Sequence, residues 1–438
     1  MPSPEPSSVL RSPKLWIGSG LIVAVVSILF ALLYVGGNVN PKGNLRDLPI
    51  ALVNSDRGAD VNGKHLNLGD QVVSGIEKSA ADNHSFSWQV VSRQEADKRL
   101  GQGKVYGALV VPENFSATVA GLGSPKPAEA TRPTLTVLTN QSAGSIGSSM
   151  ASQANQKAAH AASAQLGKEL LNRAAAQKAQ LAPAAKLMLT DPVNVEVADG
   201  HPLGTHSAMG LSAFYYALVL IVCGMLGANA IVSQVDTALG YLHTDFGPFR
   251  QRMPVRRTSR VRTLAVGTVL MLGLSLVMGS LVELATVGIL GMDASHLGLL
   301  WLYSVGTIAA VGVSALALLA VFGTPGMLIS TIVFVAMAVP SSGATVPLEA
   351  LPGFFHALSE FEPLRQITGG MRSILYYDAQ SDAGLTRAWI SMGIAFVAAV
   401  LFGFGVTRFY DRKGLHRIPP TAEATGAAEA TATAPATA

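Results

Sequence analysis

The residues of this sequence that could do chemistry are few, and none forms a recognised catalytic motif. A phosphate-binding loop of the G-x-x-x-x-G-K-[ST] type holds a nucleotide with backbone amides and a lysine. The Gly-Lys pairs of this chain are followed instead by His65, Val105 and Glu169. The sequence also has no G-x-S-x-G turn and no H-E-x-x-H zinc pair. We therefore predict no catalytic, metal-binding or cofactor-binding residue in this chain, and no enzymatic activity.

The loop 54–63, NSDRGADVNG, combines carboxylates and glycines in the manner of a calcium-binding loop. It lacks the D-x-[DN]-x-[DN]-G order and the distant glutamate that supply oxygen ligands to the ion. A polar loop after a strand is therefore favoured over a calcium site. Cys223 is the single cysteine, so no disulfide can form within the chain.

Glu283 is a carboxylate inside a long apolar run, Leu264–Leu290. Carboxylates within a membrane are costly, and they tend to face the interior of a helix bundle or a cavity. One interpretation is that Glu283 lines a transport path or takes part in gating. The other is that Glu283 lies near the outer end of its helix and reaches headgroup water.

A basic loop separates this run from the preceding one, Leu211–Val232. Short arginine-rich loops stay in the cytoplasm, because basic residues beside a span resist translocation. The loop is longer than a turn requires, and Phe246 and Phe249 among the arginines suggest a short amphipathic contact helix. We interpret the loop either as a topology signal alone or as a docking surface for a cytoplasmic partner, formed by Arg250, Arg252, Met253, Arg256 and Arg257.

The composition is that of a polytopic α-helical membrane protein. Of the 438 residues, 49% are hydrophobic and only 13% are charged, whereas soluble domains carry about 25% charged residues. A helix needs about 20 apolar residues to cross the hydrocarbon core. Six apolar runs meet this need and predict transmembrane helices at 15–37, 211–232, 264–290, 299–322, 327–346 and 388–410.

Basic residues lie beside the ends of these runs, and the net charge is only +4, so no nucleic-acid partner is expected. Arg11 and Lys14 precede the first run, and Arg412 follows the last. These positions predict cytoplasmic termini, residues 1–14 and a disordered Ala- and Thr-rich tail at 411–438, in a multi-pass plasma-membrane protein. An uncleaved anchor is favoured over a signal peptide, because the first run is long and no clear A-x-A site follows it.

Residues 38–208 are therefore extracytoplasmic, and their pattern predicts a folded α/β domain. Short β-rich runs alternate with helical stretches at 68–80 and 93–100, and an alanine-rich stretch at 145–181 predicts one or two long helices. Residues 209–410 are predicted to form a five-helix permease domain with an outside amphipathic segment at 347–387. The predicted strands are 48–54, 86–92, 105–112, 134–140 and, returning toward the membrane, 194–198.

This layout and several sequence segments resemble a known transporter family. The segments LPIALVNSDRG, HLNLGDQVV and FSWQVVSRQEADKRLGQGKVYGALVVPENFS are similar to the YhgE/Pip-like (phage infection protein) branch of type-2 ABC transporter permeases. The segment LPGFFHALSEFEPLRQITGGMRSILYYD resembles the motif before the last span of that family, with matching positions at Pro352, Pro363 and Arg372.

The resemblance implies the membrane permease subunit of a type-2 ABC exporter, assembled as a homodimer or heterodimer in the lipid bilayer. A separate nucleotide-binding ATPase subunit would sit on the basic loop between the second and third spans. Its ATP hydrolysis would drive a hydrophobic or amphipathic compound out of the cell. The branch also includes cell-surface proteins, so the alternative is a non-transporting membrane protein whose outside domain serves secretion, wall or phage binding.

Overall fold

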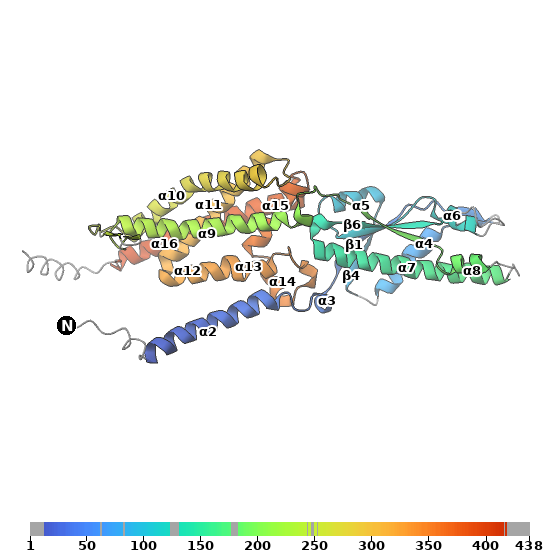
Figure 1. Ribbon diagram of the computed structural model, residues 1–438, viewed down its shortest axis with the longest axis horizontal. Coiled ribbons are helices and arrows are strands. Elements are labelled where there is room, and N and C mark those ends of the chain that lie inside the picture. Colours follow the sequence, from blue (N-terminus) through green and yellow to red (C-terminus); the bar gives the residue numbers. More distant parts are fainter. Residues whose placement is uncertain are drawn as a thin grey trace, which may run out of the picture. The chain divides into compact units, whose positions relative to one another are not determined.

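The computed structural model in Figure 1 describes residues 13–61, 64–81, 84–122, 131–176, 183–242, 244–246, 249–251, 253–415 and 417. The chain forms two compact units. Unit 1 contains the residues up to Tyr215 together with Gly291–His296 and Ala336–Arg387. Unit 2 contains Tyr216–Leu290, Leu297–Val335 and the residues from Ala388 onward. The segment before the last span thus belongs to the same unit as the α/β domain.

Five helices in the described part of the chain are long and apolar enough to cross a membrane, which makes this a multi-pass membrane protein. They correspond to the last five predicted spans, with ends that differ by a few residues. The largest difference is in the last, where the apolar helix begins at Ser381 rather than at residue 388. The five helices cover Ser212–Ala238, Arg260–Ile289, Leu297–Phe322, Thr324–Ser341 and Ser381–Arg412.

The first predicted span corresponds to helix α2 (Pro13–Gly36). The described apolar part of α2, Gly20–Gly36, is shorter than the roughly 20 residues that a span needs. A sixth crossing therefore stays a prediction. At its C-terminal end α2 approaches the segment before the last span, because a Cβ on Gly37 would lie 3.6 Å from Phe355 Cδ1. The tail from residue 418 onward lies outside the described residues.

Several spans contain local irregularities. A π-helix, Leu284–Ile289, follows α10 (Arg260–Glu283), and π-helical turns also occur at Ile332–Ala336 and Ser381–Leu385. Gly323, with a φ of +67°, makes the tight turn between Leu297–Phe322 and Thr324–Ser341. The other helices that make up the five spans are α9 (Ser212–Ala238), α11 (Leu297–Phe322), α12 (Thr324–Thr331), α13 (Ala338–Ser341) and α16 (Thr386–Arg412).

The predicted α/β domain is built on a five-stranded mixed sheet of order β4-β1-β5-β6-β7. Strand β1 is parallel to both β4 and β5, β5 is antiparallel to β6, and β6 is parallel to β7. The segment predicted as a return strand toward the membrane is therefore the sheet's edge strand. The strands are β1 (Leu48–Asn54), β4 (Phe86–Val90), β5 (Gly107–Val111), β6 (Thr134–Thr139) and β7 (Asn194–Asp199).

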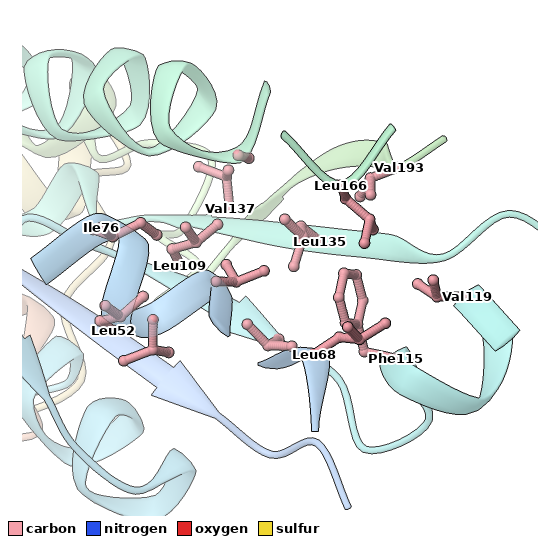
Figure 2. Close-up of a cluster of buried hydrophobic side chains, with 14 residues drawn as sticks. Leu52, Leu68, Ile76, Leu109, Phe115, Val119, Leu135, Val137, Leu166 and Val193 are labelled. Carbon is pink, nitrogen blue, oxygen red and sulfur yellow. The ribbon is translucent and has the colours of Figure 1, made fainter. Parts of the chain in front are cut away.

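Helices cover both faces of this sheet. Alternate side chains of β1 point to opposite faces, as the period of a strand requires. Leu52 belongs to a cluster with side chains of α4, α6 and α7, which Figure 2 shows around Phe115. Val53 belongs to a second cluster with Ala96 and Leu100 of α5. The helices are α4 (Leu68–Ala81), α5 (Arg93–Leu100), α6 (Phe115–Leu122), α7 (Ser145–Ala176) and α8 (Pro183–Thr190).

The segment before the last span is helical, as the family motif implies. It holds α14 (Gly353–Ser359) and α15 (Pro363–Tyr376), preceded by a short 3-10 turn, Leu348–Ala350. Smaller elements elsewhere in the described chain are α3 (Pro41–Asn44), a hairpin of β2 (Ala59–Val61) and β3 (Lys64–Leu66), and 3-10 turns at Gln141–Ala143 and Ala208–Gly210.

Candidate functional site

The basic loop between α9 and α10 is extended rather than helical. Strands β8 (Thr244–Phe246) and β9 (Phe249–Gln251) pair as an antiparallel hairpin, with Asp245 opposite Arg250. The short amphipathic contact helix predicted around the phenylalanines is therefore wrong at these positions. Of the predicted docking residues, Met253, Arg256 and Arg257 are exposed, and Arg252 lies outside the described residues.

Local contacts hold the later part of this loop against the end of α9. The backbone amide of Arg256 donates to the carbonyl of Leu239 at 3.0 Å. The Tyr241 hydroxyl donates to the carbonyl of Arg256 at 2.9 Å and accepts from the amide of Thr258 at 3.2 Å. Gly240 turns the chain with a φ of +74°, a conformation that favours glycine. The exposed arginines therefore stand on a fixed backbone.

The first turn of α10 is capped from the end of α16. The Ser259 side chain accepts from the amide of Arg262, as an N-cap residue does. The carboxylate of Asp411 accepts from the amides of Arg260 and Val261, at 2.9 and 3.1 Å. A carboxylate at this position satisfies amides that lack partners in the helix and complements the positive end of the helix dipole.

An ion pair with a buried carboxylate lies beside this cap. Both terminal nitrogens of Arg417 donate to the carboxylate of Asp236, and the Nη2–Oδ2 distance is 2.7 Å. The Asp236 side chain is only 6% exposed, whereas a third of the Arg417 side chain is exposed, so the carboxylate is the buried member of the pair. The Arg417 guanidinium also lies 5.4 Å from the ring centre of Tyr241. We call Asp236, Tyr241, Arg260, Asp411 and Arg417 the basic-end cluster; it joins α9, α10 and the end of α16 within unit 2.

Glu283 is the last residue of α10, at the end away from the basic-end cluster. Its Oε2 atom is buried and has no hydrogen-bond partner among the described residues. Its carboxylate interacts electrostatically with the phenol of Tyr216, whose hydroxyl lies 2.9 Å from Ser304 Oγ. Glu283 as a whole is half-buried, and both interpretations of its role stay predictions.

The three residues of the family motif lie at the starts of, or within, the two helices before the last span. Pro352 is the N-cap of α14, and Pro363 is the first residue of α15, where its fixed φ suits a helix start. Arg372, later in α15, donates to the carbonyl of Gly343 at 3.4 Å. These residues belong to unit 1, whereas Glu283 and the basic loop belong to unit 2.

Sequence reasoning missed two carboxylates in this segment, the half-buried Glu349 and the buried Glu362. Glu349 accepts a hydrogen bond of 3.1 Å from the Tyr106 hydroxyl of the α/β domain, and burial raises the pKa of Glu349. Glu362 is 3% exposed and caps α15 by accepting from the amides of Leu364 and Arg365, at 2.9 and 2.8 Å. The only sequence signal that Glu362 caps α15 is its position directly before Pro363.

The burial of Glu362 predicts that the stability of α15 depends on pH. Burial raises its pKa to about 7, so between about pH 4.5 and pH 7 the folded protein binds a proton that the unfolded chain has released. The stability of α15 should therefore fall as the pH rises through this range, by at most about 3 kcal/mol. We expect hydrogen exchange of the α15 amides, corrected for intrinsic rate, to be faster at pH 8 than at pH 5.

Glu362→Gln should remove this pH dependence, because glutamine does not titrate. The matched control is Glu360→Gln: the hydrogen bond from Arg365 lowers the pKa of Glu360, so this group adds nothing to the fall between pH 5 and pH 8. A wild-type protein whose α15 is equally protected at both pH values would contradict the prediction.

In the loop 54–63, which was compared with a calcium site, the carboxylate of Asp56 accepts hydrogen bonds from groups within the protein. Asp56 is 9% exposed. Its oxygens accept from the amides of Gly69 and Ser116, both at 3.0 Å, and from the Ser116 hydroxyl. Gly69 and Ser116 lie in the first turns of α4 and α6, so Asp56 caps two helices at the carboxyl edge of the sheet. In open α/β sheets this edge commonly binds a ligand; here a side chain occupies it.

Residues 19–395 match a family described as protein of unknown function, DUF3533. The match covers well over half of the 438 residues. The chain belongs to this family. The family description assigns no activity to its members, so the more specific assignment as a type-2 ABC permease remains a proposal.

The chain shares local similarity with two curated bacterial proteins. It is 33% identical over 102 residues to the uncharacterized protein YhgE of Bacillus subtilis strain 168, a match that covers 22% of the chain and 13% of that protein. It is 29% identical over 115 residues to the type VII secretion system accessory factor EsaA of Staphylococcus aureus strain USA300, covering 25% of the chain and 11% of EsaA. The matches therefore span about an eighth of these relatives. No solved structure matches the chain.

Proposed function

We propose that this chain is the membrane permease subunit of a type-2 ABC exporter that moves a hydrophobic or amphipathic compound out of the cell. A separate nucleotide-binding ATPase subunit hydrolyses the ATP, and the chain works as a homodimer or heterodimer. With α2 as a sixth span, both termini lie in the cytoplasm of the plasma membrane. This chain holds no catalytic or cofactor-binding residue of its own.

The observation that carries the proposal is the fixed backbone of the later part of the basic loop. A loop that served only as a topology signal would need arginines but no defined backbone. Here the loop is hydrogen-bonded to the end of α9, while the first turn of α10 is capped by Asp411. Exposed Arg256 and Arg257 on such a backbone suit a partner surface that carries carboxylates.

Co-purification from native membranes in mild detergent tests the docking of an ATPase. We expect a nucleotide-binding ATPase to accompany the wild type and to be lost, by at least about tenfold, from the double variant Arg256→Glu, Arg257→Glu. Two charge reversals at a partner surface create like-charge contacts, each of which costs about 1 kcal/mol or more.

The matched control is Lys157→Glu, Lys168→Glu, which makes the same change of charge at exposed positions of α7 in the α/β domain. Cysteine accessibility in each variant verifies that the topology is unchanged. If no ATPase accompanies the wild type, with the protein intact, the permease proposal fails. The surface-protein alternative, to which the secretion role in the EsaA name lends support, then takes its place.

Within this proposal Glu283 faces the transport path. Its buried, unpartnered Oε2 supports an inward position, because a carboxylate at a lipid-facing surface would need water. We expect Glu283→Gln to change the rate of ATP-dependent export several-fold and to alter how that rate varies between pH 6 and pH 8. Export by the variant that matches the wild type at both pH values would place Glu283 outside the path.

A further inference from the structure

The α/β domain has a cavity between α4 and α7 that the proposed function does not use. Its volume is about 160 Å³, and an apolar cavity of about 150 Å³ is enough to bind a benzene molecule. Both helices line it with residues spaced three and four apart, so each helix presents one face to the cavity. The aliphatic part of the wall includes Leu68, Val72 and Ile76 of α4 and Leu166 of α7. The cavity is therefore large enough for one six-membered ring.

Small residues keep this space open. Ala158, Ala161 and Ala162 line it from α7, and Gly75 lines it from α4. A Cβ on Gly75 would meet no atom within 4 Å. The larger side chains of the same two faces, such as Ile76, belong to the buried cluster in Figure 2. The core therefore holds the two helices together, while the small residues leave room between them.

The cavity offers hydrogen bonds but no free charge. Among its described lining residues only Glu169 is charged, and Arg173 donates a hydrogen bond to the Glu169 carboxylate. The exposed residues Gln71 and Gln165 line it as well, one on each helix. Neither carboxamide makes a side-chain hydrogen bond within the part of the chain that the structure describes, so each can donate to or accept from a ligand. This combination favours a neutral ligand that carries a polar group.

We propose that this cavity binds a neutral ring compound of about the size of phenol. The ring lies between α4 and α7, and its polar substituent is hydrogen-bonded to the carboxamide of Gln71 or Gln165. A rigid ring loses little conformational entropy on binding. A charged ligand would have to be desolvated against aliphatic walls without a free partner, because Glu169 is already paired with Arg173. The site goes beyond the proposed function, because it can be occupied whether or not the protein exports anything.

Two substitutions fill the cavity from opposite sides. Gly75→Leu does so from α4, and Ala161→Leu does so from α7, where Ala161 is exposed. Leucine is a good helix former, so both helices should still form. The matched control is Ser74→Leu, which adds the same side chain at an exposed residue of α4 that does not line the cavity. Because the filling variants lie on different helices, the test survives if one of them fails to fold.

Hydrogen exchange of the full protein in nanodiscs, with and without 4-fluorophenol, tests the site. At a probe concentration of about twice its Kd, exchange at residues 68–79 and 158–169 should slow by about threefold in the wild type and in Ser74→Leu. This protection should be absent from Gly75→Leu and Ala161→Leu. A phenol also enters the bilayer, but that effect would appear at the spans and would be equal in all variants. An unprotected wild type, or filling variants that are protected as strongly as the wild type, would overturn the site.

Two further comparisons test the charge of the ligand and its hydrogen bond. Benzoate has the same ring but is an anion at neutral pH, and it should bind at least about tenfold more weakly than 4-fluorophenol. The double variant Gln71→Ala, Gln165→Ala keeps the cavity open and should weaken the binding of 4-fluorophenol by about fivefold. Benzoate that protects the same amides as strongly as 4-fluorophenol would overturn the neutral ligand class. An unchanged affinity in the double variant would overturn the role of the two carboxamides.

Discussion

Replacing Asp56 by alanine should open the carboxyl edge of the α/β sheet and reduce its local stability by about 4 kcal/mol. Each buried donor left without a partner costs about 1–3 kcal/mol, and the change leaves the amides of Gly69 and Ser116 without their acceptor. The first turns of α4 and α6 would lose their cap together. Because α4 and α6 belong to one hydrophobic cluster, the loss should spread through it.

Hydrogen exchange of the full protein measures this effect directly. An opening made easier by about 4 kcal/mol should speed exchange of the α4 and β1 amides by roughly a thousandfold. Asp56→Asn keeps one acceptor oxygen and should cause about half of the free-energy change. The control is Asp60→Ala, whose side chain is 83% exposed, and it should change exchange very little. Unchanged protection in Asp56→Ala would show that the carboxylate does not cap the helices.

The strands and helices of the α/β domain were predictable because their signals are local. LPIALVN is an apolar run bounded by turn residues, and it forms β1 with the predicted bounds. Ser92 and the glycine at 101 lie at the two ends of α5, and the structure shows Ser92 accepting from the amide of Glu95. Each of these signals lies within one or two turns of the element that it defines.

The contacts that complete the candidate sites are not local. Asp411 caps α10 although it follows the first residue of that helix by about 150 positions, and Asp56 caps α6 from 60 positions upstream. A single sequence gives no signal for such pairs. The predicted contact helix in the basic loop was wrong for a related reason. Aromatic and basic residues can alternate in a hairpin as readily as they can line a short helix, and pairing with the partner strand decides for the hairpin. The spans, by contrast, follow from length and hydropathy alone.

Removing the guanidinium of Arg417 should weaken the basic-end cluster by about 2 kcal/mol. Loss of one partner of a buried ion pair costs 3–5 kcal/mol, and we reduce this figure because a third of the Arg417 side chain is exposed. The penalty comes from Asp236, which is 6% exposed and would keep its charge without a partner. Arg417→Ala should therefore loosen the end of α9 and speed hydrogen exchange at residues 238–242 by roughly thirtyfold.

A double-mutant cycle separates this penalty from ordinary truncation. Asp236→Ala, Arg417→Ala removes the uncompensated charge, so the double variant should exchange more slowly at residues 238–242 than Arg417→Ala alone. The control Lys413→Ala removes an exposed cation that contacts only the Phe409 ring among the described residues, and it should leave exchange unchanged. A double variant less protected than Arg417→Ala would mean that the pair acts through packing rather than charge.

If the loop docks an ATPase, Arg417→Ala should also lower the recovered ATPase, because the arginines on the loop would lose their fixed backbone.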